Sequence, residues 1–263
     1  MPNAGNDMRE SQRGVGMSSI IKTQPESIID KSTHYCPGCG HGVMLRLIGE
    51  VIDELGIRED MILTAPVGCS VILYDYMKCD VIECAHGRAP AVGTAIKRVH
   101  PDKFVLVYQG DGDLAAIGTA EIIHTANRGE NLSVIFVNNA VYGMTGGQMA
   151  PTTLIGQKTT TSPYGRTAKG MGKPIRVCEM MATLEETKYL ERTSIHSIRN
   201  INKTKASIKK AFLNQINGIG FSLVEVLSMC PIGWKMSPQE AQRYIESQMI
   251  DYFPLGVYKD LEY

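Results

Sequence analysis

Residues 107–118 read VYQGDGDLAAIG and place two glycines and two carboxylates between an apolar run and a helical pattern. The glycines allow a tight turn and a close approach of the backbone to a ligand. Amides at the start of the following helix can bind a phosphate, but the carboxylates of Asp111 and Asp113 would repel it unless a cation lay between them. Mg²⁺ binds both carboxylates and phosphates, so this stretch favours a magnesium-bridged phosphate site. An acidic turn or helix cap is the alternative interpretation of GDGD alone.

The segments on either side of this loop follow a strand, helix, strand pattern. Residues 103–109 (KFVLVYQ) and 132–138 (LSVIFVN) are nearly continuous apolar runs, which are typical of strands buried on both faces of a parallel sheet. Residues 114–130 predict a helix that ends near Gly129. The loop therefore lies at the carboxyl end of its strand, where α/β sheets bind ligands.

The rest of the chain extends the same pattern. Apolar residues at helical spacing predict a helix over residues 42–55, which ends before Gly56. Residues 203–216 predict a later helix, and residues 221–227 predict a strand that closes the sheet. We therefore expect an α/β fold, a parallel sheet with helices on both faces.

Two segments lack this periodicity. Residues 1–30 are polar and are interpreted as an N-terminal extension to a single domain over residues 31–263. Residues 156–174 are rich in Gly, Thr and Lys, and we expect them to form a functional loop rather than a linker.

Composition excludes several classes of protein. The chain has 263 residues and its 27 Lys and Arg balance 27 Asp and Glu, so no net positive field favours nucleic acid. No apolar stretch is long and uninterrupted enough to predict a membrane helix, and residues 1–30 lack an apolar secretion signal. We expect a cytoplasmic protein. Its seven cysteines, an odd number, then indicate metal or cofactor chemistry rather than a disulfide framework.

The second strand ends in Asn138 and Asn139, so an amide oxygen and the Asp111 carboxylate emerge at neighbouring strand ends and can face one ion. GDG, a spacer over residues 113–137 and NN together resemble the thiamine diphosphate motif. This resemblance implies that the side chains of Asp111 and Asn139 and the Val141 carbonyl bind Mg²⁺. It also implies a set of residues at the cofactor diphosphate: Gly110, Gly112, Asp113, Gly143 and Met144.

The cysteines give a second, independent signal. HYCPGCGHG (34–42) places Cys36 and Cys39 in a C-x-x-C turn of the kind that binds an iron–sulfur cluster or zinc. Two more thiolates are needed, and the candidates are Cys69, Cys79, Cys84, Cys178 and Cys230. A zinc ribbon usually has a second C-x-x-C, which is absent here.

Taken together, the motifs resemble the β subunit of the 2-oxoacid:ferredoxin oxidoreductases. The resemblance covers residues 34–258 and includes HYCPGCGHG, PVGCS, AHGRAPAVGTAIK, the GDGD and NN pair, VYGMTGGQMAPTT and the final CP. It implies a thiamine diphosphate-binding fold and a 4Fe–4S cluster held by Cys36, Cys39, Cys69 and Cys230. Cys79, Cys84 and Cys178 are then interpreted as small buried side chains.

Further site residues follow from the same resemblance. It places Val67, Gly68, Cys69, Ser70, His86 and Gly87 at the cofactor. His86 and Arg88 are candidate catalytic contacts to cofactor or substrate carboxylate, with a purely structural turn as the alternative. Candidate pocket walls are Tyr142, Thr145 and Gln148, although Thr145 and Gln148 can instead cap the following turn.

The implied reaction is the oxidative decarboxylation of a 2-oxoacid with coenzyme A as co-substrate and ferredoxin as electron acceptor. The resemblance places the pyrimidine-binding domain on a separate α subunit, so we expect this chain to be inactive alone. It also implies a γ subunit, a small ferredoxin-like subunit and external ferredoxin as partners. No nucleic acid or membrane partner is expected.

The substrate and two other classes remain open at this stage. The extended motifs resemble branched-chain, 2-oxoisovalerate members most and 2-oxoglutarate members next. A 2-oxoglutarate enzyme needs a cation for the distal carboxylate, from Arg88, Lys158, Arg166 or the α subunit. A non-oxidative thiamine diphosphate enzyme would need no four-cysteine set. A non-catalytic electron-transfer or zinc-stabilised interaction subunit would need no Mg²⁺ site.

Overall fold

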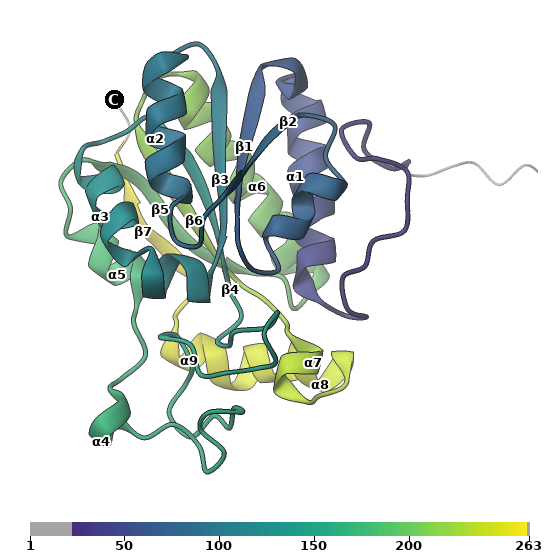
Figure 1. Ribbon diagram of the computed structural model, residues 1–263, viewed down its shortest axis with the longest axis vertical. Helices are drawn as coiled ribbons and strands as arrows, with labels where there is room; N and C mark the ends of the chain where they lie inside the picture. The colour runs from purple at the N-terminus through teal and green to yellow at the C-terminus, as the bar shows by residue number, and fades with distance from the viewer. Residues whose placement is uncertain (1–22, 262–263) are drawn as a thin grey trace, which may run out of the picture.

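A computed structural model describes residues 23–261 of the chain as an α/β sandwich around one sheet (Figure 1). The sheet has seven strands in the order β2-β1-β3-β4-β6-β5-β7. All neighbouring strands are parallel except β7, which pairs with β5 in the antiparallel sense. The strands are β1 Met61–Pro66, β2 Asp80–Cys84, β3 Phe104–Gly110, β4 Ser133–Asn138, β5 Thr187–Ser194, β6 Phe221–Leu227 and β7 Gly256–Asp260.

Helices cover both faces of the sheet (Figure 1). Helices α1 and α6 pack on one face, and α2, α3 and α5 on the other. The helices are α1 Gly40–Leu55, α2 Ala89–Val99, α3 Thr119–Asn127, α4 Ala168–Met171, α5 Val177–Ala182, α6 Ile198–Ile216, α7 Pro231–Trp234, α8 Pro238–Tyr244 and α9 Ile250–Tyr252. Among residues 23–261, no helix is long and apolar enough to cross a membrane.

Strand β3 shows why a continuous apolar run was needed. Its side chains alternate between the two faces, so Leu106 and Tyr108 join the core beneath α1 and α6. Val105 and Val107 join the opposite core, beneath α2 and α3. Because both faces are covered, both sets of side chains have to be apolar.

The strands and helices expected from the sequence are present, with three differences. The helix expected over residues 203–216 begins at Ile198, because Ser197 caps it by accepting a hydrogen bond from the Asn200 amide. The helix after GDGD begins with a π-helical turn, Asp113–Ile117, before α3. The prediction that residues 221–227 close the sheet is wrong, because β6 lies between β4 and β5 inside the sheet.

The strand order gathers the sequence motifs at one edge of the sheet. Strands β1, β3, β4 and β6 are consecutive neighbours and parallel, so their carboxyl ends point the same way. PVGCS begins with the last residue of β1, GDGD with the last residue of β3 and NN with the last residue of β4, and SMCP follows β6. Four segments that are distant in sequence therefore meet at this edge.

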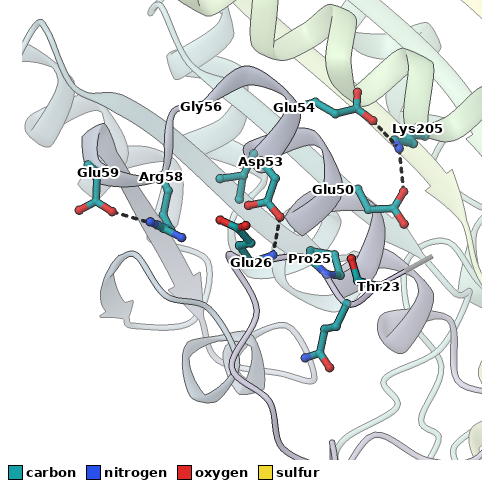
Figure 2. Close-up of a pocket in the computed structure, with 12 residues that line it drawn as sticks. Thr23, Pro25, Glu26, Glu50, Asp53, Glu54, Gly56, Arg58, Glu59 and Lys205 are labelled. Carbon is teal, nitrogen blue, oxygen red and sulfur yellow. Dashed lines mark hydrogen bonds and ion pairs between the residues drawn. The ribbon is translucent and has the colours of Figure 1, made fainter. Parts of the chain in front are cut away.

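Two segments lie outside the sheet, the residues before α1 and the loop over residues 156–174. Of the expected extension 1–30, residues 1–22 lie outside the described residues. The Glu26 amide donates to the Asp53 carboxylate on α1 at 2.6 Å (Figure 2). The Ser27 amide donates to the same carboxylate at 3.0 Å. Residues 156–174 form a loop that projects beyond the sheet edge (Figure 1).

Candidate functional site

A cavity of about 150 Å³ opens where β1, β3 and β4 end. It brings together most of the residues that the resemblance places at the cofactor. These are Val67, Gly68, Cys69, Ser70, His86, Gly110, Asp111, Gly112, Asp113, Asn139, Val141, Gly143 and Met144, and they are joined by His41, Tyr142 and Thr145.

Asp111 is a buried carboxylate of the cavity wall. Its Oδ2 accepts hydrogen bonds from Thr152 Oγ1 at 2.6 Å and the Val141 amide at 3.2 Å, and its Oδ1 accepts one from the Gly112 amide at 2.9 Å. Burial raises the pKa of Asp111 to about 6, although these hydrogen bonds oppose the rise. The carboxylate is therefore ionised at neutral pH in a site that favours a compensating cation.

Asn139 also binds the Val141 amide. The Val141 N–H donates both to Asp111 Oδ2 and, at 3.3 Å, to Asn139 Oδ1, which brings the two oxygens together. Ala140, which lies between Asn139 and Val141 in the chain, adopts the left-handed conformation at φ 56°, which is costly for a residue with a Cβ. Thr153 Oγ1 holds this turn by donating to the Ala140 carbonyl at 2.7 Å.

These residues fit a magnesium-bound diphosphate. Carboxylate, amide and backbone carbonyl oxygens are the ligands that Mg²⁺ prefers. Within residues 23–261, the carbonyls of Asn139, Ala140 and Tyr142 accept hydrogen bonds, whereas the Val141 carbonyl accepts none and stays available for an ion. No lysine or arginine of the described chain lines the cavity, so an anionic ligand there needs a metal ion to offset its charge.

Gly112 is required by the ring of Tyr142. A Cβ at position 112 would lie 2.2 Å from Tyr142 Cε1, so no other residue fits without moving the ring. The ring in turn forms part of the cavity wall. Gly112, the second glycine of GDG, therefore sets the shape of the cavity as well as the turn.

Asp113 ties the loop before α2 to the GDGD turn. Its Oδ1 accepts a hydrogen bond from the Gly87 amide and lies 2.6 Å from His86 Nδ1, while its Oδ2 accepts one from Gln109 Nε2. The His86 contact lacks hydrogen-bond geometry. Gly87 thus lies behind the cavity wall rather than in it.

The C-x-x-C turn is joined directly to the final CP segment. The Cys39 amide donates to the Cys36 carbonyl at 2.9 Å, and Gly38 closes the turn at φ 76°. The Gly40 amide then donates to the carbonyl of Met229, the residue before Cys230, at 3.1 Å. Cys39 and Cys230 occupy the N-cap positions of α1 and α7, and neither side chain makes a capping hydrogen bond.

Cys69 and Cys230 meet across Gly143. A Cβ at position 143 would lie 3.2 Å from Cys230 Sγ and 3.6 Å from Cys69 Sγ. Burial, followed by the charges of neighbouring thiolates, raises the pKa of Cys69 to about 12, with Cys39 and Cys36 as those neighbours. Cys230 is raised to a pKa of about 12 by burial, with Cys39 and Cys69 adding to the rise.

The four thiols fit a cluster better than a single ion. Among the described residues, no three His, Cys, Asp or Glu side chains lie close enough together to hold one metal ion. A tetrahedral zinc site requires such convergence, whereas a 4Fe–4S cluster gives each cysteine its own iron. The other cysteines lie elsewhere: Cys84 and Cys178 are in the core beneath α2, α3 and α5, and Cys79 packs against the opposite core.

His41 is a cavity residue that the sequence did not single out. Its Nδ1 lies 2.6 Å from Tyr108 Oη, and its ring stacks on Tyr35 with centroids 5.5 Å apart. Complete burial lowers the pKa of His41 to about 4, so the ring is neutral at physiological pH. Its place at the end of the CPGCGH segment was the only sequence signal.

Three candidate cations lie away from the cavity. Arg88 pairs with Glu121 on α3 and does not line the cavity, so its contact with cofactor or substrate stays a prediction. Lys158 is exposed on the projecting loop. Arg166 is buried and its guanidinium is already engaged by the carbonyls of Ala150, Pro151, Thr153, Met171, Gly172 and Lys173.

Of the expected pocket walls, Tyr142 and Thr145 line the cavity. Gln148 instead accepts a hydrogen bond from Thr145 Oγ1 at 2.6 Å.

Comparison with known proteins agrees with this geometry. Residues 67–226 match the family described as thiamine pyrophosphate enzyme, C-terminal TPP binding domain, thiamine pyrophosphate being another name for thiamine diphosphate. The chain is 41% identical over 204 residues to the 2-oxoglutarate synthase subunit KorB of Methanocaldococcus jannaschii, covering 77% of this chain and 71% of that protein. The chain belongs to the family of 2-oxoacid:ferredoxin oxidoreductase subunits.

Another relative of the 2-oxoacid:ferredoxin oxidoreductase family is more similar but longer. The chain is 49% identical over 254 residues to the ketoisovalerate oxidoreductase subunit VorA of Methanothermobacter thermautotrophicus, covering 93% of this chain and 53% of that protein. The chain thus spans about half the length of that relative. A solved 2-oxoglutarate:ferredoxin oxidoreductase from Magnetococcus marinus matches with a TM-score of 0.74 and 24% identity, over 93% of this chain and 87% of that one.

These findings confirm the family and the α/β thiamine diphosphate-binding fold expected from the sequence. The matched cofactor-binding segment of the 2-oxoacid:ferredoxin oxidoreductase subunit contains Asp111, Asn139 and Cys69. Cys36, Cys39 and Cys230 lie outside it. The roles of individual residues in holding Mg²⁺ and a cluster are therefore proposals that rest on the geometry.

Proposed function

We propose that this chain is the subunit of a 2-oxoacid:ferredoxin oxidoreductase that binds thiamine diphosphate, Mg²⁺ and a 4Fe–4S cluster. The enzyme would oxidatively decarboxylate a 2-oxoacid with coenzyme A as co-substrate and ferredoxin as electron acceptor. One observation carries the proposal: Gly143 lines the same cavity as Asp111 and Asn139, and a Cβ on it would lie 3.2 Å from Cys230 Sγ and 3.6 Å from Cys69 Sγ.

The GDG and NN turns would hold the cofactor diphosphate. Asp111 Oδ, Asn139 Oδ1 and the Val141 carbonyl are the proposed Mg²⁺ ligands, and the metal would offset the negative charge that the cavity walls cannot. Bound thiamine diphosphate supplies a carbanion that attacks the keto carbon and an electron sink for decarboxylation. The protein contributes a buried, preorganised anchor for the diphosphate end.

The second part of the proposal is the proximity of the cluster. Cys36, Cys39, Cys69 and Cys230 would each bind one iron. Cys69 itself lines the cavity, and Gly143 has no side chain to separate the Cys230 thiol from it. A one-electron acceptor held by these thiols would be close enough to remove electrons singly from the cofactor.

His86 is the proposed contact at the mouth of the cavity. Its side chain is 32% exposed, and its Nδ1 faces Asp113 Oδ1 at 2.6 Å, which leaves Nε2 for a ligand. Thr145 and Tyr142 would complete the wall around the substrate.

Partner subunits would complete the site. Val67, Ile117 and Met144 are 43%, 50% and 46% exposed, and Val67 and Met144 line the cavity. Apolar side chains at the rim of an open cavity favour a covering protein surface. We propose that an α subunit with the pyrimidine-binding domain covers this rim, and that a γ subunit and a small ferredoxin-like subunit complete the assembly and pass electrons to external ferredoxin.

The favoured substrate is 2-oxoisovalerate, with 2-oxoglutarate next. The greater identity to a ketoisovalerate oxidoreductase subunit, 49% against 41% for a 2-oxoglutarate synthase subunit, supports this order. The cavity supports it too, because no lysine or arginine of residues 23–261 lines it and Arg166 is fully engaged in its loop. A distal carboxylate would need a cation from the α subunit.

The test is an anaerobic assay of the complex that co-purifies with this chain. Coenzyme A-dependent reduction of ferredoxin is measured with 2-oxoisovalerate and with 2-oxoglutarate. We expect a higher kcat/KM for 2-oxoisovalerate and no turnover by the isolated chain. A higher kcat/KM for 2-oxoglutarate would overturn the substrate order. Turnover by the isolated chain would overturn the proposal that the active site is shared with another subunit. If neither acid supports coenzyme A-dependent reduction of ferredoxin, the proposed reaction is wrong.

A further inference from the structure

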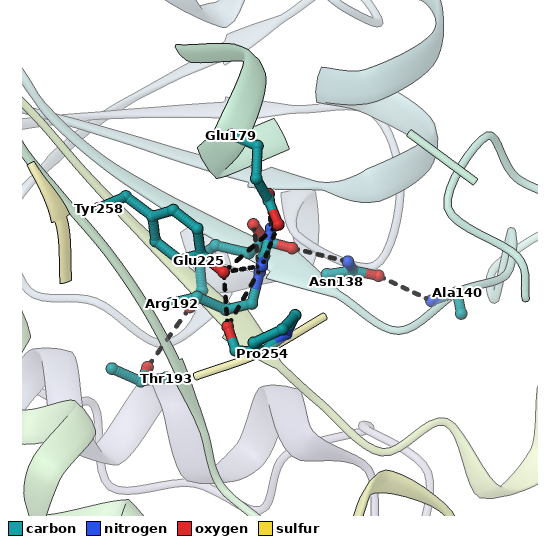
Figure 3. A network of polar contacts seen from close by, with 8 residues as sticks. All are labelled: Asn138, Ala140, Glu179, Arg192, Thr193, Glu225, Pro254 and Tyr258. Carbon is teal, nitrogen blue, oxygen red and sulfur yellow. Dashed lines mark hydrogen bonds and ion pairs between the residues drawn. The ribbon is translucent and has the colours of Figure 1, made fainter. Parts of the chain in front are cut away.

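A chain of buried polar contacts runs from β5 through β6 to the end of β4, where the turn that carries Asn139 and Val141 begins (Figure 3). The side chains of Arg192 on β5 and Glu225 on β6 are both 0% exposed, and Arg192 Nε lies 2.9 Å from Glu225 Oε2. The other oxygen, Glu225 Oε1, accepts a hydrogen bond from Asn138 Nδ2 at 2.8 Å. Asn138 is the last residue of β4, so the ion pair reaches the first asparagine of NN.

The Glu225 carboxylate fixes which way the Asn138 amide faces. Because a carboxylate only accepts hydrogen bonds, Asn138 must turn its NH₂ group toward Glu225. Its Oδ1 then faces the Ala140 amide and accepts a hydrogen bond from it at 3.2 Å. The reversed amide would set two oxygens against each other at one end and two donors at the other.

That second hydrogen bond holds a strained turn. Ala140 lies at φ 56°, a conformation that persists only where the surroundings impose it. The Asn138 bond to the Ala140 amide is one of the contacts that impose it. The turn sets the directions of the Asn139 side chain and the Val141 carbonyl.

The opposite end of the chain of contacts fixes Arg192. Its Nη2 and Nη1 lie 2.6 and 3.1 Å from the two carboxylate oxygens of Glu179 on α5. The Pro254 carbonyl accepts from Nη1 at 3.3 Å, and Tyr258 accepts from the same nitrogen. Glu179 and Glu225 therefore share one guanidinium, but of the two carboxylates only Glu225 bonds to Asn138.

We infer that Glu225, anchored by Arg192, is a positioning residue for the metal site, acting through Asn138 on the turn at 139–141. Neither Glu225 nor Arg192 lines the cavity, so neither contacts cofactor or substrate. The inference rests on the proposed function, because it takes Asn139 and Val141 as Mg²⁺ ligands. On this inference the buried Arg192–Glu225 pair raises the affinity of the site for Mg²⁺, in addition to any contribution to the fold.

The test compares two variants that each remove one carboxylate from the same guanidinium. Mg²⁺-dependent binding of thiamine diphosphate to the purified complex is titrated for the natural chain, Glu225→Gln and Glu179→Gln, with thermal unfolding of each. An amide at 225 no longer selects one orientation of Asn138. We expect Glu225→Gln to raise the Mg²⁺ concentration for half-saturation about 10-fold to 100-fold. Glu179→Gln should leave it within about twofold, whatever its effect on unfolding.

Equal weakening of Mg²⁺ binding by both variants, or natural affinity in Glu225→Gln, would overturn the inference. If Glu225→Gln does not fold, Asn138→Ala decides, because it breaks the same link and leaves the ion pair in place. Weaker Mg²⁺ binding in that variant supports the inference, and unchanged binding overturns it. The proposed function fails in a different way, with no Mg²⁺-dependent binding by the natural chain.

Discussion

The ring of Tyr142 lies directly against Gly112, so that a Cβ on residue 112 would stand 2.2 Å from Tyr142 Cε1. The two residues come from the ends of neighbouring strands, β3 and β4, and both line the cavity. The GDG and NN turns are therefore interlocked by side-chain shape as well as by the proposed ion.

This contact predicts the effect of Gly112→Ala. The methyl group has to displace the Tyr142 ring, so we expect a loss of about 1–3 kcal/mol in the free energy of unfolding, as for other overpacked sites. Thiamine diphosphate binding should weaken as well, because the ring is part of the cavity wall. Urea unfolding and a binding titration measure the two effects. Gly42→Ala is the matched control, since nothing lies within 4 Å of a Cβ there, and a variant at 112 that behaves like it would contradict this account.

Asp111→Asn should abolish the metal site while leaving most of the fold. We expect Mg²⁺-dependent binding of thiamine diphosphate to weaken on the order of 100-fold or more, because the only ionised Mg²⁺ ligand proposed is lost. Isothermal titration measures it. Thr152→Val removes only a hydrogen bond to the same carboxylate and should cost less. Equal affinities for the Asp111→Asn and natural chains would rule out Asp111 as a ligand.

The raised pKa of Asp111 predicts how Mg²⁺ binding depends on pH. Burial brings this pKa to about 6, so below pH 6 a proton competes with the ion. Affinity for Mg²⁺ should fall roughly tenfold for each pH unit below that value and stay level above it. Without metal, the stability of the fold has the opposite pH dependence to Mg²⁺ affinity. The folded state binds the Asp111 proton more tightly than the unfolded state does, so the free energy of unfolding falls as pH rises from 3.8 to about 6. Titrations at pH 5, 6 and 7 check it, and a flat profile would contradict it.

Cysteine replacements should separate cluster ligands from core residues. Cys230→Ser is expected to lose most of the bound iron and sulfide, because one iron loses its thiolate. Cys79→Ser should keep them, since Cys79 packs against the core beside β1 and is not a proposed ligand. Iron and sulfide are measured on anaerobically purified protein. Full iron content in Cys230→Ser would remove Cys230 from the proposed ligand set.

Arg166 should matter for the projecting loop rather than for substrate choice. Its guanidinium binds carbonyls from Ala150 to Lys173, and these lose their partner in Arg166→Met. We expect the free energy of unfolding to fall by about 3 kcal/mol or more and cleavage within 156–174 to speed up under limited proteolysis. Lys158→Met, at an exposed position of the same loop, is the control. A change in oxoacid preference without loss of stability would contradict this role.

Local sequence signals predicted the centre of the fold well. Strand β3, strand β4 and helix α1 end within a few residues of the expected positions, because apolar runs and glycine caps act over short distances. The meeting of Asp111 and Asn139 also follows from motif spacing, since neighbouring parallel strands bring their carboxyl ends together. The other expected cavity residues came from the family resemblance.

Strand β5 shows what local signals cannot give. It reads TKYLERTS, and its central Glu191 and Arg192 look solvent-exposed in isolation, yet both are buried. Burial of the Arg192 charge is tolerated there because Glu225 on β6 and Glu179 on α5 pair with it. Such pairing depends on strand order, which local sequence signals do not give. For the same reason they did not show that β6 lies inside the sheet. His41 was missed for a similar reason, because its partner Tyr108 comes from a distant strand.

The most direct test of the central claim is the content of iron, acid-labile sulfide, zinc and thiamine diphosphate in the complex isolated without oxygen. The account predicts about four iron, four sulfide and one thiamine diphosphate for each copy of this chain. Thiamine diphosphate without iron would indicate a non-oxidative enzyme. Zinc without thiamine diphosphate would mean that the Asp111 turn binds no cofactor, and would contradict the account.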